Sequence, residues 1–320
     1  MEESPADLQA IIQSKEWTPE QQIRELQRRI GILTSYLRSE VPSFTPRPTD
    51  IICAVPPKNG TTWVAHICHQ IRMQGAEPGF KDQVPDVVCF IDLSMKVFQV
   101  DPHDCIQPAH PRVYVTHLPY DLLPKGGKLI YVFRDQKDVL YSLYRMVDSD
   151  AALKGRVSLP IFSHATIKGG EIEKNMKHLL KWWEHRNDAD KIVLFYDDLK
   201  EDHAGSVRRI AKFMGVDCSE EVIARVVHTT SHSEMSQHAS KFGTAPLPQN
   251  IIDKLGEAPV KDGTHVGRVR KDGGRSNDGK VLPPDVQTHI EQAWKEIVTA
   301  KLGFNNLKEM RDAWRKELSL

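Results

Sequence analysis

Four short runs of β-forming apolar residues constrain the fold of this chain more than any other feature. Each run is apolar throughout, which is typical of strands in a parallel sheet that helices cover on both faces. Helical patterns of ordinary length lie between most of the runs. We therefore predict an α/β fold, a single domain with a central parallel β-sheet flanked by helices, over residues 1–320, with 1–17 as a flexible N-terminus. The runs are Ile51–Val55, Val113–Val115, Leu129–Phe133 and Ile192–Phe195.

A helix is predicted ahead of the first run. Thr18 is suited to cap the free N–H groups, and Pro19 suits the first helical position. Apolar residues then recur at three- and four-residue steps from Ile23 to Leu37, which gives the helix one apolar face. We expect this face to cover the sheet of the same domain rather than to bind a partner.

Polar residues follow each run directly. Lys58 comes after the first run, His117 after the second, Arg134 after the third and Tyr196 after the fourth. Ligands of open parallel sheets bind beyond the carboxyl ends of the strands. Two cations, an imidazole and a phenol at one edge are the expected lining of a site for a phosphate ester.

The turn after the first run has the chemistry of a phosphate-binding loop. Gly60 lets the backbone turn tightly, and the N–H groups at the start of the following helix favour an anion. Thr61 and Thr62 add hydroxyl donors, Lys58 adds a charge, and Trp63 offers a flat face for a purine. The turn is P-loop-like but lacks the G-x-x-x-x-G-K-[ST] spacing of the nucleoside triphosphatases. Other elements must therefore identify its ligand.

Those elements occur in a characteristic order. The run Pro57–Trp63 resembles the 5′-phosphosulfate loop of the cytosolic sulfotransferases, which depend on 3′-phosphoadenosine 5′-phosphosulfate (PAPS). The segment from Thr116 to Pro124 resembles the THLP…LLP segment of that family, and Tyr131–Val139 with Ser142 resembles its 3′-phosphate motif. The resemblance covers roughly residues 20–310, so the chain is identified as a member of the family. Further matching segments are Trp182–Glu184, Leu194–Asp202, Thr230–Met235 and Arg270-Lys271 with Gly273-Gly274.

The resemblance implies that PAPS is the co-substrate and that adenosine 3′,5′-bisphosphate is a product. The phosphate loop would hold the 5′-phosphosulfate, Trp63 would stack on adenine, and Arg134 would contact the 3′-phosphate with two donors at once. The residues that the resemblance assigns to the co-substrate are Lys58, Asn59, Gly60, Thr61, Thr62, Trp63, Arg134, Ser142, Tyr196, Thr230, His232, Arg270, Lys271 and Gly273.

Three residues are predicted to carry the chemistry. His117 is the expected general base, because an imidazole can accept a proton near neutral pH. Lys58 would stabilise charge on the departing oxygen, and Ser142, by resemblance, would restrain Lys58 until the acceptor arrives. We expect direct in-line transfer of a sulfuryl group to a hydroxyl or amine of a small molecule, without a metal.

The sequence departs from the family pattern at several positions. Val115 stands where the family has a lysine two residues before its histidine, and Asn59 replaces a serine. Phe90, Asp92 and Asp148 fall in segments that border the acceptor pocket in relatives. The carboxylates of Asp92 and Asp148 indicate either solvated loops or a cationic acceptor, and the sequence leaves both readings open.

Composition excludes other classes of protein. The 43 Lys and Arg balance 43 Asp and Glu, and no apolar run reaches a membrane span, so we expect no nucleic-acid or membrane partner. Five scattered cysteines and an acidic N-terminus predict reduced thiols and a cytoplasmic location. The pairs His66/His69 and His228/His232 lack a third ligand, so no metal site is expected.

Two alternatives to a sulfotransferase remain at this level. One is a P-loop kinase, against which the missing G-K-[ST] ending argues. The other is a family member that binds nucleotide without catalysis, for which Val115 is the only hint. The sequence does not decide between a monomer and a homodimer.

Overall fold

The computed structural model describes residues 17–37, 44–76, 87–92, 101–149, 153–242, 249–256, 269 and 278–318. The predicted N-terminal segment, apart from Trp17, lies outside these ranges. So do three residues that the resemblance assigned to the co-substrate, namely Arg270, Lys271 and Gly273.

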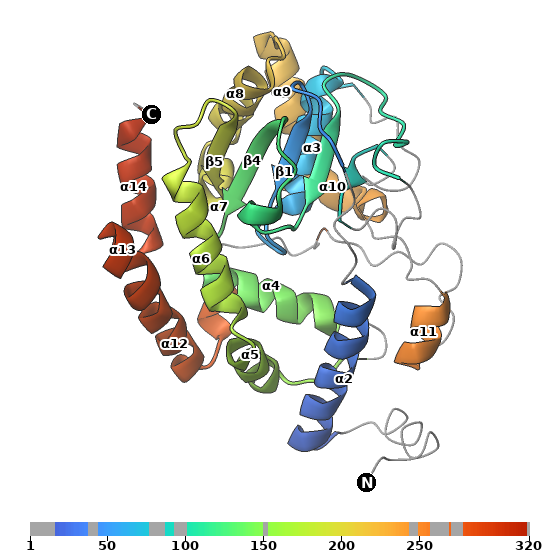
Figure 1. The fold of residues 1–320 in the computed structure, drawn as a ribbon, viewed down its shortest axis with the longest axis vertical. Helices are drawn as coiled ribbons and strands as arrows, with labels where there is room; N and C mark the ends of the chain where they lie inside the picture. The colour runs from blue at the N-terminus through green and yellow to red at the C-terminus, as the bar shows by residue number, and fades with distance from the viewer. Residues whose placement is uncertain are drawn as a thin grey trace.

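In the described part of the chain, five parallel strands form one sheet in the order β2-β3-β1-β4-β5 (Figure 1). The four predicted runs are β1, β3, β4 and β5, so the predicted central parallel sheet is confirmed. Ile51 of β1 lies opposite Val113 of β3 and Lys128 of β4. β2 was not predicted, because its two residues are too few to form a pattern. The strands are β1 Ile51–Ala54, β2 Cys89–Phe90, β3 Val113–Thr116, β4 Lys128–Phe133 and β5 Lys191–Phe195.

Helices flank the sheet, and side-chain caps mark where several of them begin. Asp135 accepts a hydrogen bond from the N–H of Lys137 at the start of α4, and Asn306 accepts one from Glu309 at the start of α14. The helices are α2 Pro19–Leu37, α3 Thr61–Arg72, α4 Gln136–Asp148, α5 Leu159–Lys168, α6 Glu171–Glu184, α7 Tyr196–Glu201, α8 His203–Met214, α9 Glu220–Thr229, α10 His232–Gln237, α11 Gln249–Leu255, α12 Pro284–Trp294, α13 Ala300–Leu302 and α14 Leu307–Glu317, with 3₁₀ turns at Tyr120–Leu122, Ala239–Lys241 and Asp278–Val281 and a π-helical segment at Lys295–Thr299.

Two hydrophobic layers join these helices to the sheet. On one face, α3, α8 and α9 pack through mostly aliphatic side chains such as Ile67 and Val207. On the other face, α4, α6, α12 and α14 pack through a layer rich in aromatic rings, in which Tyr131 of β4 stacks on Trp182 of α6 with 4.7 Å between ring centroids. The strands are therefore buried on both faces, as their sequences predict.

The predicted first helix forms as α2 but does not cover the sheet. Its main contacts are with α5 and α11 (Figure 1). Arg28 donates to the carbonyl oxygens of Lys254 and Leu255 of α11, and Gln22 accepts from the N–H of Ser158 beside α5. The expectation of a sheet-covering helix was wrong, since an apolar face does not specify which element it will meet.

A disulfide joins Cys89 of β2 to Cys105, so the prediction that all five cysteines are reduced is also wrong. The two residues are 16 positions apart in sequence, and only the fold brings their Cα atoms to 6.4 Å. Cys53, Cys68 and Cys218 are free thiols.

No helix in the described ranges is both long and apolar enough to cross a lipid bilayer.

Candidate functional site

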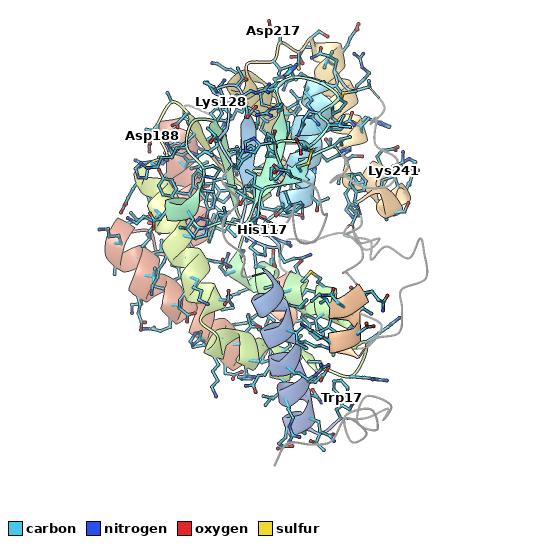
Figure 2. The ribbon with its side chains drawn as sticks, turned by 45° about the vertical axis from the view of Figure 1, so that its right-hand side comes forward. Trp17, His117, Lys128, Asp188, Asp217 and Lys241 are labelled. Carbon is cyan, nitrogen blue, oxygen red and sulfur yellow. A yellow bond between two sulfur atoms is a disulfide. The ribbon has the colours of Figure 1, made fainter. Side chains whose placement is uncertain are left out.

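The carboxyl ends of the strands bring polar side chains to one edge of the sheet. His117 follows β3 and lies at the opposite end of the sheet from Lys128, the first residue of β4 (Figure 2). Lys58, Arg134 and Tyr196 follow β1, β4 and β5. The neighbours β1 and β4 lead into α3 and α4, which cover opposite faces of the sheet. Connections that diverge in this way create the crevice in which open α/β sheets bind ligands.

The loop between β1 and α3 is built for close approach of an anion. Lys58 and Gly60 both have left-handed backbones, with φ of 64° and 107°. A Cβ atom on Gly60 would lie 2.9 Å from the ring of Tyr196, so the position accommodates glycine alone. The buried Oγ1 of Thr61, at the start of α3, has no hydrogen-bond partner among the described residues. An anion at this helix N-terminus would satisfy that hydroxyl.

Asn59 ties the loop to the turn after β4. Its side chain is fully buried, its Oδ1 accepts from the N–H of Arg134 at 2.9 Å, and its Nδ2 donates to the carbonyl of Pro57 at 3.0 Å. The departure from the family serine therefore has a structural role, because Asn59 joins the loop to Arg134 of the segment that resembles the 3′-phosphate motif.

Arg134 is a buried cation with unused hydrogen-bonding capacity. Its guanidinium carbon lies 4.4 Å from the ring centroid of Tyr196, and its Nη2 lies 3.8 Å from Oδ2 of Asp138. Its Nε is buried and meets no acceptor among the described residues. A buried guanidinium whose Nε–H has no acceptor is suited to bind an anion such as a phosphate.

Trp63 is fixed between three elements. Its Nε1 donates to the carbonyl oxygen of Thr230 at 2.8 Å. The ring of Tyr196 lies 5.4 Å from its centroid and the ring of His203 5.3 Å, both in edge-to-face orientation. The predicted adenine-side residues Trp63, Tyr196 and Thr230 are thus brought together by the fold.

Sequence reasoning did not assign His203 to this group. It follows directly on the Leu194–Asp202 segment that carries the family resemblance, and its Nε2 lies 3.0 Å from the hydroxyl of Thr230. Burial holds the pKa of its imidazole below the usual value. Its place next to a motif is the only signal that the sequence offers.

Two hydrogen bonds that involve the main chain help to hold His117. Its Nδ1 lies 2.6 Å from the carbonyl oxygen of Val55, and its backbone N–H donates to Oδ2 of Asp92 at 3.1 Å. The ring of Phe90 lies 5.5 Å away, edge to face. A carbonyl can only accept, so Nδ1 carries the proton and Nε2 carries the lone pair of the neutral ring. Two of the predicted acceptor-side residues, Phe90 and Asp92, are therefore neighbours of His117.

Val115 supplies no charge to the site. It is 1% exposed and packs in the aliphatic layer, opposite Cys53 of β1. The place of the family lysine is thus filled by the hydrophobic core.

Other predicted residues lie further along the same elements. Ser142 is half-buried in the second turn of α4, and His232 is the first residue of α10. Asp148 lies at the far end of α4, roughly 20 Å along the helix from Arg134, where it accepts from the N–H of Gly155.

The histidine pair His66/His69 is buried in α3. Burial lowers the pKa of His66 to about 4 and that of His69 to about 3, so both imidazoles are neutral at neutral pH. His66 contacts the carbonyl oxygen of Thr229 through Nε2, and His69 Nδ1 accepts from Arg72. Among the described residues, no three side chains of metal-binding type cluster together.

Helix α14 supports the strand and helix that present Tyr196. Arg311 donates through Nη2 to Oδ1 of Asp198 at 2.6 Å and lies 3.5 Å from Oδ2 of Asp197. Trp314 donates to the carbonyl of Val193 in β5 at 3.3 Å. The start of α7 is thus anchored by residues more than 100 positions later in the chain.

Comparison with known proteins identifies the class to which this fold and site belong. A family model described as the sulfotransferase domain matches residues 48–253, so the chain belongs to the sulfotransferase family and is an enzyme. The recognition made from the sequence motifs is confirmed.

Particular relatives agree with this family. The chain is 33% identical to Sulfotransferase 1E1 of Homo sapiens over 221 residues, which cover 67% of this chain and 75% of that protein. It is 32% identical to Sulfotransferase 1 family member D1 of Mus musculus over 220 residues, again 67% and 75% of the two chains. In fold it is similar to a retinol dehydratase solved in a complex with retinol and PAP, with a TM-score of 0.61, 19% identity, and coverage of 88% of this chain and 95% of that one.

Proposed function

We propose that this sulfotransferase moves the sulfuryl group of PAPS directly, in line, to a hydroxyl or amine of a small molecule, with His117 as general base. The observation that carries the proposal is the position of His117. Its Nδ1 proton points to the Val55 carbonyl, so Nε2 carries the lone pair at the same sheet edge as the phosphate loop. A fixed tautomer of this kind is what a general base needs.

The residues at the sheet edge fit the PAPS molecule. Thr61 Oγ1 and Arg134 Nε, both buried without an acceptor among the described residues, match its two anionic ends. We assign the 5′-phosphosulfate to the 58–62 loop and the start of α3, the 3′-phosphate to Arg134 with Ser142, and adenine to Trp63 and Tyr196. When bound, PAPS supplies the sulfuryl group, and adenosine 3′,5′-bisphosphate remains after transfer.

His117 would take the acceptor's proton as its oxygen or nitrogen attacks sulfur. Proton removal by a positioned side chain contributes about 10²- to 10⁴-fold to the rate of an enzymatic reaction. The bond from Asp92 to the His117 N–H and the edge contact from Phe90 restrain the direction in which the ring points. These neighbours do not exchange protons in our mechanism.

Lys58 is the cation that we assign to the developing charge on the leaving phosphate oxygen. Its left-handed backbone places it in the tightest part of the loop, half-buried beside Asn59. Because Val115 leaves no second cation on β3, Lys58 would bear more of this electrostatic role than a loop lysine in a relative with both charges. Arg270, Lys271 and Gly273 stay assigned to the 3′-phosphate by resemblance only.

We take the acceptor to be a small molecule, in keeping with the retinol dehydratase of similar fold that was solved in a complex with retinol and PAP. The neighbours of His117 give it one aromatic wall, Phe90, and one carboxylate, Asp92. A cytoplasmic location, a single domain over the whole chain, and either a monomer or a homodimer remain predictions from the sequence.

Two measurements test the function. Adenosine 3′,5′-bisphosphate should raise the melting temperature of the protein far more than ATP with magnesium, because Arg134 selects a 3′-phosphate. Mass spectrometry should then detect a mass gain of one sulfuryl group in a mixed library of phenols, alcohols and amines incubated with PAPS. Stabilisation by ATP alone would favour a kinase, and binding of the bisphosphate with no product from any acceptor would favour a non-catalytic member.

A further inference from the structure

Trp63 is held in place by a residue that lies just outside the motifs of the family resemblance. We propose that His203 is a positioning residue for Trp63: it donates from Nε2 to Thr230, packs edge to face with the indole, and so fixes the ring on which the donor's adenine stacks. The inference rests on the proposed function, because it takes Trp63 as the adenine-stacking residue.

Three elements meet at this point. Trp63 lies in the first turn of α3, His203 is the first residue of α8, and Thr230 is the C-cap directly after α9. The carbonyl of Thr230 accepts from the indole Nε1 at 2.8 Å, while the imidazole lies 5.3 Å from the indole centroid at 61°. The indole is thus restrained through its N–H and by an edge-to-face ring contact.

The hydrogen bonds of the Thr230 hydroxyl define the tautomer of His203. The hydroxyl of Thr230 lies 2.6 Å from the carbonyl oxygen of Val226, which can only accept, so the single hydroxyl proton is used there. The 3.0 Å contact between the same hydroxyl and Nε2 of His203 must then be a donation from the imidazole. The neutral ring therefore has its proton on Nε2 and its lone pair on Nδ1.

These hydrogen bonds also determine which group of Thr230 serves the adenine site. Its hydroxyl donates to Val226 and accepts from His203, and its residue is fully buried. The hydroxyl proton is not available to the donor in this arrangement. Thr230 therefore serves the adenine site through its carbonyl oxygen, which holds Trp63, and His203 in turn holds Thr230.

Burial favours the neutral form of the His203 ring. Burial lowers the pKa of His203, and the carboxylate of Asp202, one residue earlier, opposes this shift. The side chains that contact the ring from the other elements, Trp63 and Thr230, carry no charge. The N-terminus of helix α8 also disfavours a positive charge, so it too favours the neutral form of the ring.

The first experiment measures the affinity of the full-length protein for adenosine 3′,5′-bisphosphate by calorimetry at pH 7.5. We expect His203→Ala to raise the Kd about ten-fold, the loss expected when one hydrogen bond and one ring contact no longer orient the indole. His203→Gln should stay within about three-fold of the wild type, since its amide can donate to Thr230. His289→Ala, which removes an exposed histidine of α12, is the control and should not change the Kd.

The second experiment reads the contact itself. A protonated imidazole quenches an adjacent indole, so wild-type emission should fall relative to His203→Gln as the pH is lowered from 7.5 to 5. This difference should vanish when both proteins also carry Trp63→Phe, which separates Trp63 from the other five tryptophans. The Trp63-dependent signal reports the contact between the two rings, and the Kd of His203→Ala reports whether that contact serves donor binding.

The outcomes separate the inference from the function on which it rests. If the wild type does not bind the bisphosphate, the proposed donor is wrong. If the wild type binds but His203→Ala binds equally well, or if the fluorescence difference persists without Trp63, the positioning role is wrong. If His203→Ala is unfolded, His203→Gln still decides: a Kd raised as far as that of a Trp63→Ala protein would overturn the role assigned to the Nε2 donation.

Discussion

The two sides of the site are built in different ways. On the donor side, made of residues 58–63 with Arg134, Tyr196 and His203, side chains from separate elements hold one another. The base side is made of Val55, Phe90, Asp92 and His117. Two of the hydrogen bonds that hold His117 involve the main chain, and all four residues lie in the strands or just after them.

This difference has a consequence for mutation. In the proposed site many side chains would share donor binding, so a single substitution should reduce it by a moderate factor. The proposed base is one imidazole, whose supporting groups include a carbonyl oxygen that no substitution removes. Loss of that imidazole should therefore affect the rate much more than loss of any donor-side group affects affinity.

The largest expected effect is that of His117→Ala. Turnover at saturating PAPS should fall about 10²- to 10⁴-fold, because no group then accepts the acceptor's proton. The Kd for adenosine 3′,5′-bisphosphate should change less than two-fold, which calorimetry would check. Near-normal turnover with the donor bound would remove His117 from the mechanism.

Lowering the pH should destabilise the folded protein through His66, which is buried in α3 behind the donor side. Its folded pKa of about 4 lies under the usual 6.5, so the unfolded chain binds more protons between these values. The free energy of unfolding should therefore fall as pH drops from 6.5 towards 4, by on the order of 3 kcal/mol from this group.

Urea unfolding at pH 7, 5.5 and 4.5 measures this loss. His66→Asn should reduce the pH dependence by the share of this group, while buried His69 continues to contribute, and the exposed control His289→Ala should leave it unchanged. An unchanged slope in His66→Asn would show that this imidazole is not buried in its neutral form.

Arg134→Lys tests whether the donor side reads the 3′-phosphate. The substitution keeps the charge but loses the planar fork, so the Kd for adenosine 3′,5′-bisphosphate should rise about ten-fold. The Kd for adenosine 5′-phosphate, which has no 3′-phosphate, is the matched control and should change little. Equal weakening of both nucleotides would assign Arg134 to another part of the donor.

The smallest expected effect is that of Asp92→Asn on the base side. Asparagine keeps an oxygen that can accept from the His117 N–H, so turnover should stay within about three-fold of the wild type. Asp92→Ala removes that acceptor and should lower turnover about five- to ten-fold in the same assay. A larger loss in the asparagine variant would mean that the charge of Asp92 itself matters, for example to a cationic acceptor.

Much of the fold could be predicted because its strands are short, apolar on both faces and followed by polar residues. Strands β1, β3, β4 and β5 differ from the predicted runs by one residue at an end at most. The two-residue β2 could not be predicted, because its pairing with Tyr114 and Val115 depends on a neighbour rather than on its own pattern. The partners of α2 were missed for a similar reason.

The site could be predicted as a set of residues but not as an arrangement. The ordered motifs name Trp63, Thr230 and His117, yet the bonds that orient them run to Val55, Asp92 and His203, far away in the sequence. Hydrogen bonds to main-chain carbonyls leave no trace in residue identity. The Cys89–Cys105 bond was missed for a different reason: the sequence shows both cysteines but not that the fold brings them together.

The anchoring of Asp198 by Arg311 has a consequence for folding during synthesis and for the choice of expression fragments. The two residues are 113 positions apart, so a chain that emerges from the ribosome can form its sheet well before α14 exists to support α7. A fragment trimmed to the family-matched residues 48–253 would leave the Asp198 carboxylate without its partner and uncover the part of β5 on which Trp314 rests. The segment that presents Tyr196 would therefore gain its full support only after α14 has formed, and a fragment that ends at residue 253 would lack that support.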